Sequence, residues 1–243
     1  MTFAKLEMGG NATGITSQIR FCSMSSIRPF KKITEVTFVQ ERLLFPISWL
    51  NKQDFCEYQI YLENIKGIKI EPTRAMIEGR DEHQALFNEF AQKAAPATLE
   101  EVMTESKTAK VLSREFRVTD LVHGIYGFID EIWLTPESFV IIDDKPGIKK
   151  YLSNIHQVYG YCLAFKTVVE VGDTRQIVAA LRERGTDNIY WQVPFNPNAE
   201  QEIIDIIYRI HALLSGKAQF KSADNPNKCR SCKLIGHCDR VSR

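Results

Sequence analysis

Two carboxylates and an ammonium group come close together in the middle of the sequence. Asp130 ends the run Gly-Phe-Ile-Asp, and Asp143 and Lys145 follow a short turn later as part of Asp-Asp-Lys. A hard divalent cation binds oxygen ligands, and a lysine beside it can position or deprotonate water and counter the charge that builds on a phosphate. The pattern therefore predicts metal-dependent cleavage of a phosphodiester. A lone Asp-x-Lys is more often an ordinary charged strand end, so other residues must support the hypothesis.

A β-hairpin is the element that would bring these groups together. Apolar and polar residues partly alternate from Val122 to Leu134, and a Thr-Pro-Glu-Ser turn leads into a short apolar run that ends at Asp143. Pairing of the two strands places Asp130 and Asp143 near one ion. Because successive side chains alternate between faces, Asp143 and Lys145 share a face if the strand continues that far.

Two predicted helices add polar groups to this set. His83 lies on the inward face of an apolar pattern with helical spacing, where a histidine is either a core residue or a ligand. A second helix, which Ser153 can cap, carries Gln157 and Tyr161 four residues apart and therefore on one face.

The order Gly-x-x-x-His, Gly-x-x-Asp, Asp-x-Lys and Gln-x-x-x-Tyr resembles the RecB-like branch of the PD-(D/E)XK nuclease superfamily, from about residue 48 to residue 238. The resemblance implies an α/β (α+β) fold, a restriction-endonuclease-like core with a mixed central sheet flanked by helices. It also implies the assignment of metal ligands: His83, Asp130, Asp143 and the main-chain carbonyl of Asp144. An imidazole among oxygen ligands suits Mn at least as well as Mg.

The same resemblance implies roles for the remaining motif residues. Lys145 matches the catalytic lysine, and Gln157 and Tyr161 match the pair that orients this lysine and contacts the DNA. Asp144 stands where the family more usually has an aromatic residue. Its carboxylate either binds a second ion or faces solvent, and we expect it to face solvent.

Three late cysteines have the spacing of a metal site. Cys229 and Cys232 form a Cys-x-x-Cys pair, and Cys238 follows shortly after. Three thiolates need a fourth ligand, which Cys56 or His237 could supply, and four-cysteine zinc is chemically plausible. The resemblance implies instead that Cys56 joins the three late cysteines to hold a 4Fe-4S cluster, which would staple the early and late segments together.

The chain length and the first residues limit the overall organisation. The 243 residues are 44% hydrophobic, enough for one sizeable core, and we expect residues 46–243 to form one nuclease domain after an extension of unknown role at residues 1–45. Residues 33–44 are predicted to add a strand or hairpin. No signal-peptide core and no membrane-spanning run occurs, which predicts a reducing, cytoplasmic setting without membrane attachment. Cys22 has no predicted role, and Cys162 is predicted to be a buried apolar residue.

The charge balance limits how the chain can bind nucleic acid. A net charge of +1 excludes strong attraction over the whole surface, so binding must be local. Two basic groups could provide such contacts: Lys149 and Lys150 after the Asp-Asp-Lys strand, and Lys228, Arg230 and Lys233 around the late cysteines. The alternative for each group is an ordinary solvent-exposed surface without a partner. Trp49, Tyr58 and Tyr61 are candidates for stacking on unpaired bases, although such residues are more often core. This combination favours single-stranded DNA or frayed ends.

The motif set is closest in size and layout to the CRISPR-associated exonuclease family four and its stand-alone archaeal and viral relatives. The resemblance implies trimming of short DNA fragments together with the CRISPR integrase proteins. No Gly-x-x-x-x-Gly-Lys-Ser/Thr loop is present, so unwinding would need a separate helicase. Two alternatives remain, a repair or replication nuclease of the same fold and a non-catalytic iron-sulfur DNA-binding scaffold. Every expected catalytic position is filled, which favours an enzyme.

Overall fold

The computed structural model describes the chain over residues 3–5, 28–29, 35–39, 42–169 and 171–242. The strands in chain order are β1 (Phe3–Lys5), β2 (Arg28–Pro29), β3 (Thr37–Val39), β4 (Arg42–Pro46), β5 (Ala95–Ala97), β6 (Val111–Asp120), β7 (Ile125–Leu134), β8 (Ser138–Lys145), β9 (Gln176–Glu183) and β10 (Ile189–Pro194). The helices are α1 (Ser48–Cys56), α2 (Tyr58–Ile60), η1 (Tyr61–Ile65), α3 (Arg74–Lys93), α4 (Leu99–Glu105), α5 (Leu152–Lys166), α6 (Pro197–Leu214), α7 (Pro226–Arg230) and η2 (Ile235–His237).

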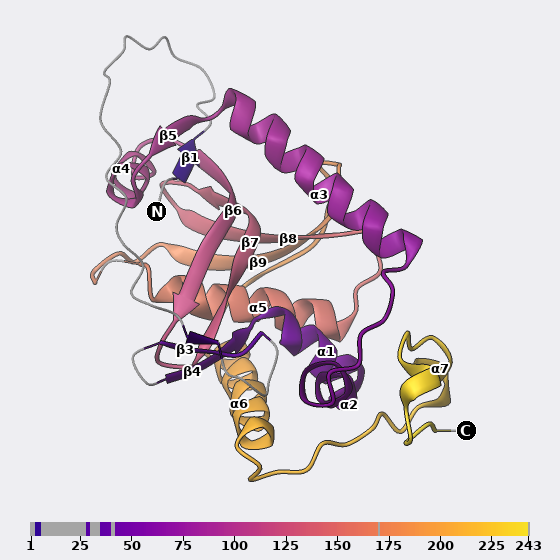
Figure 1. Ribbon diagram of the computed structural model, residues 1–243. Coiled ribbons are helices and arrows are strands. Elements are labelled where there is room, and N and C mark those ends of the chain that lie inside the picture. The colour runs from indigo at the N-terminus through magenta and orange to yellow at the C-terminus, as the bar shows by residue number, and fades with distance from the viewer. Residues whose placement is uncertain (1–2, 6–27, 30–34, 40–41, 170, 243) are drawn as a thin grey trace.

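An eight-stranded mixed sheet forms the centre of the described part of the chain. Its order is β10-β9-β8-β7-β4-β3-β2, and β6 also pairs with β7. The pairs β8/β9 and β4/β7 are parallel, and the other pairs are antiparallel. Helix α3 crosses one side of the sheet, and α5 covers the other (Figure 1). The predicted mixed α/β fold with a central sheet flanked by helices is therefore confirmed.

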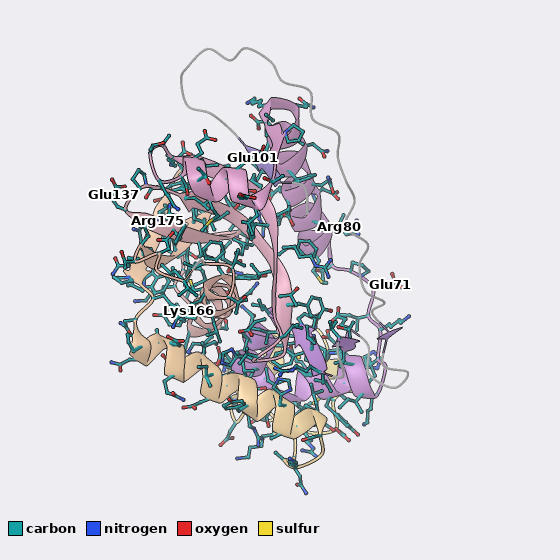
Figure 2. The ribbon with its side chains drawn as sticks, turned by 90° about the vertical axis from the view of Figure 1, so that its left-hand side faces the viewer. Glu71, Arg80, Glu101, Glu137, Lys166 and Arg175 are labelled. Carbon is teal, nitrogen blue, oxygen red and sulfur yellow. The ribbon has the colours of Figure 1, made fainter. Side chains whose placement is uncertain are left out.

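The main core lies between the sheet and α5. The ring of Phe165 on α5 packs edge-on against Phe139 and Phe116, at centroid distances of 5.3 and 5.7 Å. A Cβ at Gly160 would lie only 2.3 Å from Leu50 Cδ1, so α5 can approach α1 this closely only with glycine there. Lys166 at the end of α5 reaches α6, where it pairs with Glu200 at 2.8 Å (Figure 2). These contacts fix the position of α5 against the sheet.

Strand β7 changes partner along its length. Its second half pairs with β8, from Glu131 opposite Ile142 to the end of the strand, whereas its first residues pair with β4, with Ile125 opposite Phe45. Asp130 lies directly before the paired half. The strands diverge at this position, which gives side chains from β7, β8 and α5 a common opening.

The alternation of buried side chains shifts by one residue at the same place. On β6, Val111 and Phe116 both face the core, although strict alternation would put residues an odd number of positions apart on opposite faces. Glu115 lies between them and has a left-handed φ of 50°. On β7, Ile129 and Ile132 show the same shift around Asp130. A left-handed φ is costly for a residue with a side chain and is often found at functional sites. The shift turns Glu115 and Asp130 out of the regular sheet faces.

Most predicted elements occur, with extended boundaries. The hairpin is β7 and β8, and β8 continues through Lys145. The sequence also predicts strands over residues 177–182 and 189–195, and the helical spacing of Ile203, Ile207, Ile210 and Leu214 predicts a long amphipathic helix. These elements are confirmed as β9, β10 and α6, although α6 begins earlier, with Asn196 capping Ala199. Helix α5 starts at Leu152, before the predicted Ser153 cap. Strands β3 and β4 pair antiparallel in the predicted segment 33–44, of which residues 33–34 and 40–41 lie outside the described residues, and β4 continues beyond it to Pro46. Strand β6 was not predicted.

Two further observations concern the predictions about cysteines and membranes. Cys162 is fully buried, as expected for an apolar core residue, whereas Cys22 lies outside the described residues. Among the described helices, none combines the length and apolar character that crossing a membrane requires.

Candidate active site

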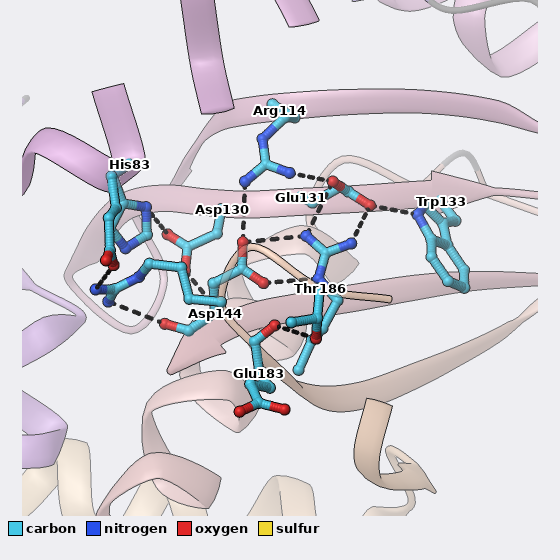
Figure 3. Close-up of polar contacts among 11 residues, drawn as sticks. His83, Arg114, Asp130, Glu131, Trp133, Asp144, Glu183 and Thr186 are labelled. Atoms are coloured by element: carbon cyan, nitrogen blue, oxygen red, sulfur yellow. Dashed lines mark hydrogen bonds and ion pairs between the residues drawn. The ribbon is translucent and has the colours of Figure 1, made fainter. Parts of the chain in front are cut away.

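Three potential metal ligands meet at the fork between β7 and β8. His83 from α3, Glu115 from β6 and Asp130 from β7 each offer a ligand atom, and these atoms all lie within 4.8 Å of one another. His83 Nδ1 is 3.9 Å from Asp130 Oδ1 (Figure 3). The side chains of His83, Glu115 and Asp130 are half-buried. One imidazole and two carboxylates form a suitable donor set for Mn²⁺ or Mg²⁺.

The backbone explains why these three side chains meet. Glu115 and Asp130 occupy facing positions in the antiparallel β6/β7 pair, because Arg114 lies opposite Glu131 and Phe116 lies opposite Ile129. The Cβ atoms of facing residues lie close together. The hydroxyl of Thr73 accepts from the backbone N–H of Met76 and starts α3, whose third turn carries His83 over the sheet.

A chain of polar contacts runs from Asp143 into α5. Lys145 Nζ lies 2.6 Å from Asp143 Oδ2 and donates to Gln157 Oε1 at 3.1 Å, and Gln157 Nε2 donates to the Tyr161 hydroxyl at 3.4 Å. Asp143 and Tyr161 are buried. Lys145 is therefore held between β8 and α5 in one orientation. These are the residues that the sequence analysis grouped together.

Burial sets the electrostatics of the two acids. It raises the pKa of Asp143 to about 7, an effect opposed by Lys145 and increased by the neighbouring Asp130. It also raises the pKa of Asp130 to about 6, although the backbone N–H of Asp144 donates to Asp130 Oδ2 at 2.7 Å. Burial likewise raises the pKa of Glu115. A buried group of acids with so little compensating charge is suited to a divalent cation.

The histidine is suited to the same role. Burial lowers the pKa of His83, and the nearby guanidinium of Arg184 lowers it further. The imidazole is therefore neutral near pH 7, which is the form that binds metal ions.

The side chain of Asp144 does not face solvent, and this prediction was wrong. It is 1% exposed and points to the opposite side of β8 from Asp143. There it accepts from Arg182 Nε at 2.8 Å and from Arg114 Nη2 at 2.9 Å, and Glu131 completes the cluster with both arginines (Figure 3). We call Arg114, Glu131, Asp144 and Arg182 the ionic quartet. The alternation of the strand places this carboxylate away from the metal-ligand set.

Glu115 is the site residue that the sequence analysis missed. Strand β6 was not recognised, because the shift at Glu115 interrupts its alternating pattern. The signal that could have found it is a strand-like run, Ser-Arg-Glu-Phe-Arg-Val, with an acid at the point where the alternation breaks.

A cavity of about 430 Å³ opens onto this group. Its walls include His83, Glu115 and Asp130 together with Phe128 and Tyr126, which lie on the same strand as Asp130. Phe128, two positions from Asp130, is 49% exposed, which is unusual for a large apolar residue. The candidate metal ligands are therefore open to this cavity, and an aromatic side chain lies beside them.

The aromatic residues that we predicted as stacking candidates are in part core residues instead. Trp49 is fully buried and Tyr58 is 3% exposed, and Tyr61 packs against Tyr58 and Phe220. Neither Trp49 nor Tyr58 can stack on a base, because α1 and α2 turn both rings inward.

The two predicted basic patches differ in their availability. Lys149 and Lys150 are exposed in the loop that follows β8. In contrast, Lys228 Nζ donates to the Asp54 carbonyl at 2.7 Å, and Lys233 pairs with Glu63 at 2.6 Å. Arg230 contacts Asn227 beside them. The lysines after β8 are therefore the more available contacts for a phosphate backbone.

The four candidate cysteines line one small cavity. It measures about 20 Å³ and lies between α1, α2 and the C-terminal segment, with Cys56, Cys229, Cys232 and Cys238 in its wall. The backbone N–H of Ala223 donates to Cys56 Sγ at 3.2 Å, and Gln59 Nε2 donates to Cys232 Sγ at 3.2 Å. Donors of this kind stabilise thiolates bound to a metal centre.

The spacing of these sulfurs bears on which centre they suit. A tetrahedral zinc site with Zn–S bonds of about 2.3 Å holds its sulfurs about 3.8 Å apart. In the described part of the chain, the His83 group is the set of three or more ligand atoms that meets the 4.8 Å spacing, and the thiols do not. No three of these sulfurs therefore all lie within 4.8 Å of one another. His237 is exposed and does not line the cavity.

No protein-family model and no curated protein matches the sequence. Among solved structures, the chain is similar to a protein described as SSO0001, with a TM-score of 0.40 and 13% identity, over 83% of this chain and 88% of that one. It is also similar to a protein from Eubacterium rectale that is provisionally described as an exonuclease, with a TM-score of 0.32 and 14% identity, over 81% and 72% of the two chains. Likeness at this level supports neither a family nor an activity, so a functional conclusion has to come from the site itself.

Proposed function

We propose that this protein is a metal-dependent deoxyribonuclease that hydrolyses phosphodiester bonds. The observation that carries the proposal is the meeting of His83, Glu115 and Asp130 beside the Asp143–Lys145 pair, at an opening of the sheet. A structural ion pair alone would not need an imidazole, two further acids and a cavity beside it.

The side chains divide the chemistry between them. Mn²⁺ or Mg²⁺ would be held by His83, Glu115, Asp130 and Asp143, and the bound ion supplies Lewis-acid activation of water and phosphate. Lys145 Nζ counters charge that builds on the phosphate and helps to position the attacking water. Gln157 and Tyr161 hold that lysine in place, so little reorganisation is needed when DNA arrives.

Single-stranded DNA and frayed ends are the substrates that the site favours. Exposed Phe128 offers a stacking surface for an unpaired base, and Lys149 and Lys150 can contact the backbone. The net charge of +1 makes recognition depend on such local contacts. We propose exonucleolytic trimming of ends, with a separate helicase where duplex must be opened.

We further propose that Cys56, Cys229, Cys232 and Cys238 hold a 4Fe-4S cluster. Their common cavity and their N–H···S contacts support a shared metal centre, and the family resemblance favours a cluster over a single zinc ion. Iron and acid-labile sulfide in the purified protein are expected. Zinc without iron would overturn this part of the proposal.

The biological setting follows from the family resemblance rather than from the site. We propose trimming of DNA fragments before their insertion into a CRISPR array by the integrase proteins in the cytoplasm. The alternative is a repair or replication nuclease with the same chemistry, and gene neighbourhood distinguishes the two. Residues 46–243 would form the nuclease domain and residues 1–45 an accessory segment.

The direct test is DNA degradation with Mn²⁺ or Mg²⁺, with chelator controls, on single-stranded, tailed and closed circular DNA. Asp130→Ala and Lys145→Ala should each reduce the rate by at least about 100-fold. Asp205→Ala and Lys217→Ala change exposed residues away from the site and should retain activity. Wild-type inactivity on every substrate with both metals would favour a non-catalytic DNA-binding scaffold.

A further inference from the structure

Arg184 lies directly after β9, next to the candidate active site. Its backbone N–H donates to the Lys145 carbonyl at 2.8 Å, which ties it to the strand that carries the lysine. Its Nη2 lies 3.4 Å from the Asp144 carbonyl, and Nη1 lies 3.4 Å from Glu82 Oε2 on α3 (Figure 3). The guanidinium thus sits between β8 and α3, the two elements that supply Lys145 and His83.

The contacts of this guanidinium are weak for so buried a cation. The side chain is only 12% exposed, both of its side-chain hydrogen bonds are long at 3.4 Å, and Glu82 is 61% exposed. Its Nε is buried and has no hydrogen-bond partner. A buried guanidinium normally forms short, paired contacts with carboxylates, as Arg182 does in the ionic quartet. Arg184 therefore has donor capacity that the protein itself does not use.

The helix is built to admit this side chain. A Cβ added at Gly79 would lie 2.9 Å from Arg184 Nη1, closer than such contacts allow. Gly79 is four residues before His83, on the same face of α3. The glycine in the Gly-x-x-x-His motif thus has a physical reason in this chain, because it leaves room for a cation beside the histidine.

Charge balance identifies what the cation is for. Glu115, Asp130 and Asp143 can carry three negative charges, whereas a divalent ion with Lys145 and Arg184 carries four positive charges. The carboxylate of Glu82 would equalise the two counts, but it is 61% exposed and lies 3.4 Å from Arg184 Nη1, so solvent screens its charge. A cation held beside the carbonyl that follows Asp143 would repel a metal ion in the same site unless an anion lay between them. A DNA phosphate is the anion that the proposed reaction supplies.

We propose that Arg184 is a phosphate-binding residue that contacts the backbone of DNA bound at the candidate metal site. This inference rests on the proposed nuclease function and adds to it a second cationic contact besides Lys145. Arginine suits this position because its planar donors match phosphate oxygens.

The first test compares Arg184→Ala and Arg184→Lys with wild type on a labelled single-stranded oligonucleotide in Mn²⁺. Arg184→Ala should lower kcat by roughly 100- to 1000-fold, and Arg184→Lys should recover part of this loss. Arg74→Ala removes the same charge from the exposed first turn of α3 and should behave as wild type. Calorimetry with Mn²⁺ alone should show binding to Arg184→Ala that is at least as tight as to wild type, because a like charge has been removed.

The second test moves Arg184 without removing it. Gly79→Ala forces the guanidinium to shift, and kcat should therefore fall. Thermal stability should hold, because alanine is a better helix former than glycine. In the Arg184→Ala background, Gly79→Ala should have no further effect on kcat.

The outcomes separate this inference from the function on which it rests. An inactive wild type refutes the nuclease proposal itself. An active wild type with unchanged kcat in folded Arg184→Ala overturns the role of Arg184. Loss of Mn²⁺ affinity in step with activity would also overturn it, because that result indicates that Arg184 only supports the metal ligands.

Discussion

Replacing Asp144 by asparagine tests whether this side chain serves the sheet or the metal. The change keeps the shape and removes one negative charge from the ionic quartet, leaving Arg114 and Arg182 to share the single carboxylate of Glu131. The backbone N–H that donates to Asp130 stays in place. The structure therefore predicts a loss of stability without a loss of chemistry.

The size of the effect follows from the burial of the quartet. Asp144 is bonded by Arg182 at 2.8 and 3.0 Å and by Arg114 at 2.9 Å, and the side chains of the quartet are 8% exposed or less. Solvent screening is weak there, and breaking one partner of a buried pair costs about 3–5 kcal/mol. At about 2–4 °C per kcal/mol for a chain of this length, Tm should fall by roughly 6–20 °C.

The assay is thermal and urea unfolding of wild type, Asp144→Asn, Arg182→Met and the double variant, each in the presence of chelator. Each single variant leaves an unbalanced charge, whereas the double variant leaves Arg114 paired with Glu131. The double variant should therefore be more stable than the sum of the single effects predicts, by about 1–3 kcal/mol.

Activity supplies the refuting result. Below its Tm, Asp144→Asn should cleave DNA at a rate near that of wild type and bind Mn²⁺ equally well. A variant with unchanged stability and weakened Mn²⁺ binding would show that the Asp144 carboxylate belongs to the metal site, and the assignment to the quartet would be wrong.

Three further predictions concern the substrate, the acids and the cysteines. Phe128→Ala should slow cleavage of single-stranded DNA by about tenfold, as expected for loss of a base-stacking contact of 1–3 kcal/mol; an equal rate on normal DNA, or the same loss on an abasic strand, would contradict stacking. Burial raises the pKa of Asp143 to about 7, so the folded protein binds more protons than the unfolded chain between about pH 4 and pH 7. Metal-free wild type should therefore lose stability relative to Asp143→Asn as the pH rises from 5 to 8, measured by urea unfolding. Stability that rises over this range relative to the variant would contradict the raised pKa. Cys229→Ser should lower iron content and Tm together, measured by metal analysis and calorimetry, and a fully stable variant without iron would argue against a structural cluster.

The sequence by itself determined the local groupings of the candidate site. Asp143 and Lys145 share a face because strand side chains alternate, and Gln157 and Tyr161 share a face because a helix turns every 3.6 residues. The same reasoning predicted the hairpin, α5, α6 and the two later strands. These features depend on residues a few positions apart, so periodicity alone was enough to place them.

Only the tertiary structure decided which distant residues join those groups. Glu115 enters the site through the pairing of β6 with β7, and Arg184 enters through the parallel pairing of β8 with β9. The shift at Glu115 interrupts the alternating pattern by which its strand would have been predicted. The carboxylate of Asp144, which we expected in solvent, is hydrogen-bonded within the ionic quartet. Strand register and the burial of charge depend on contacts between residues far apart in the chain. Local sequence periodicity carries no information about such contacts.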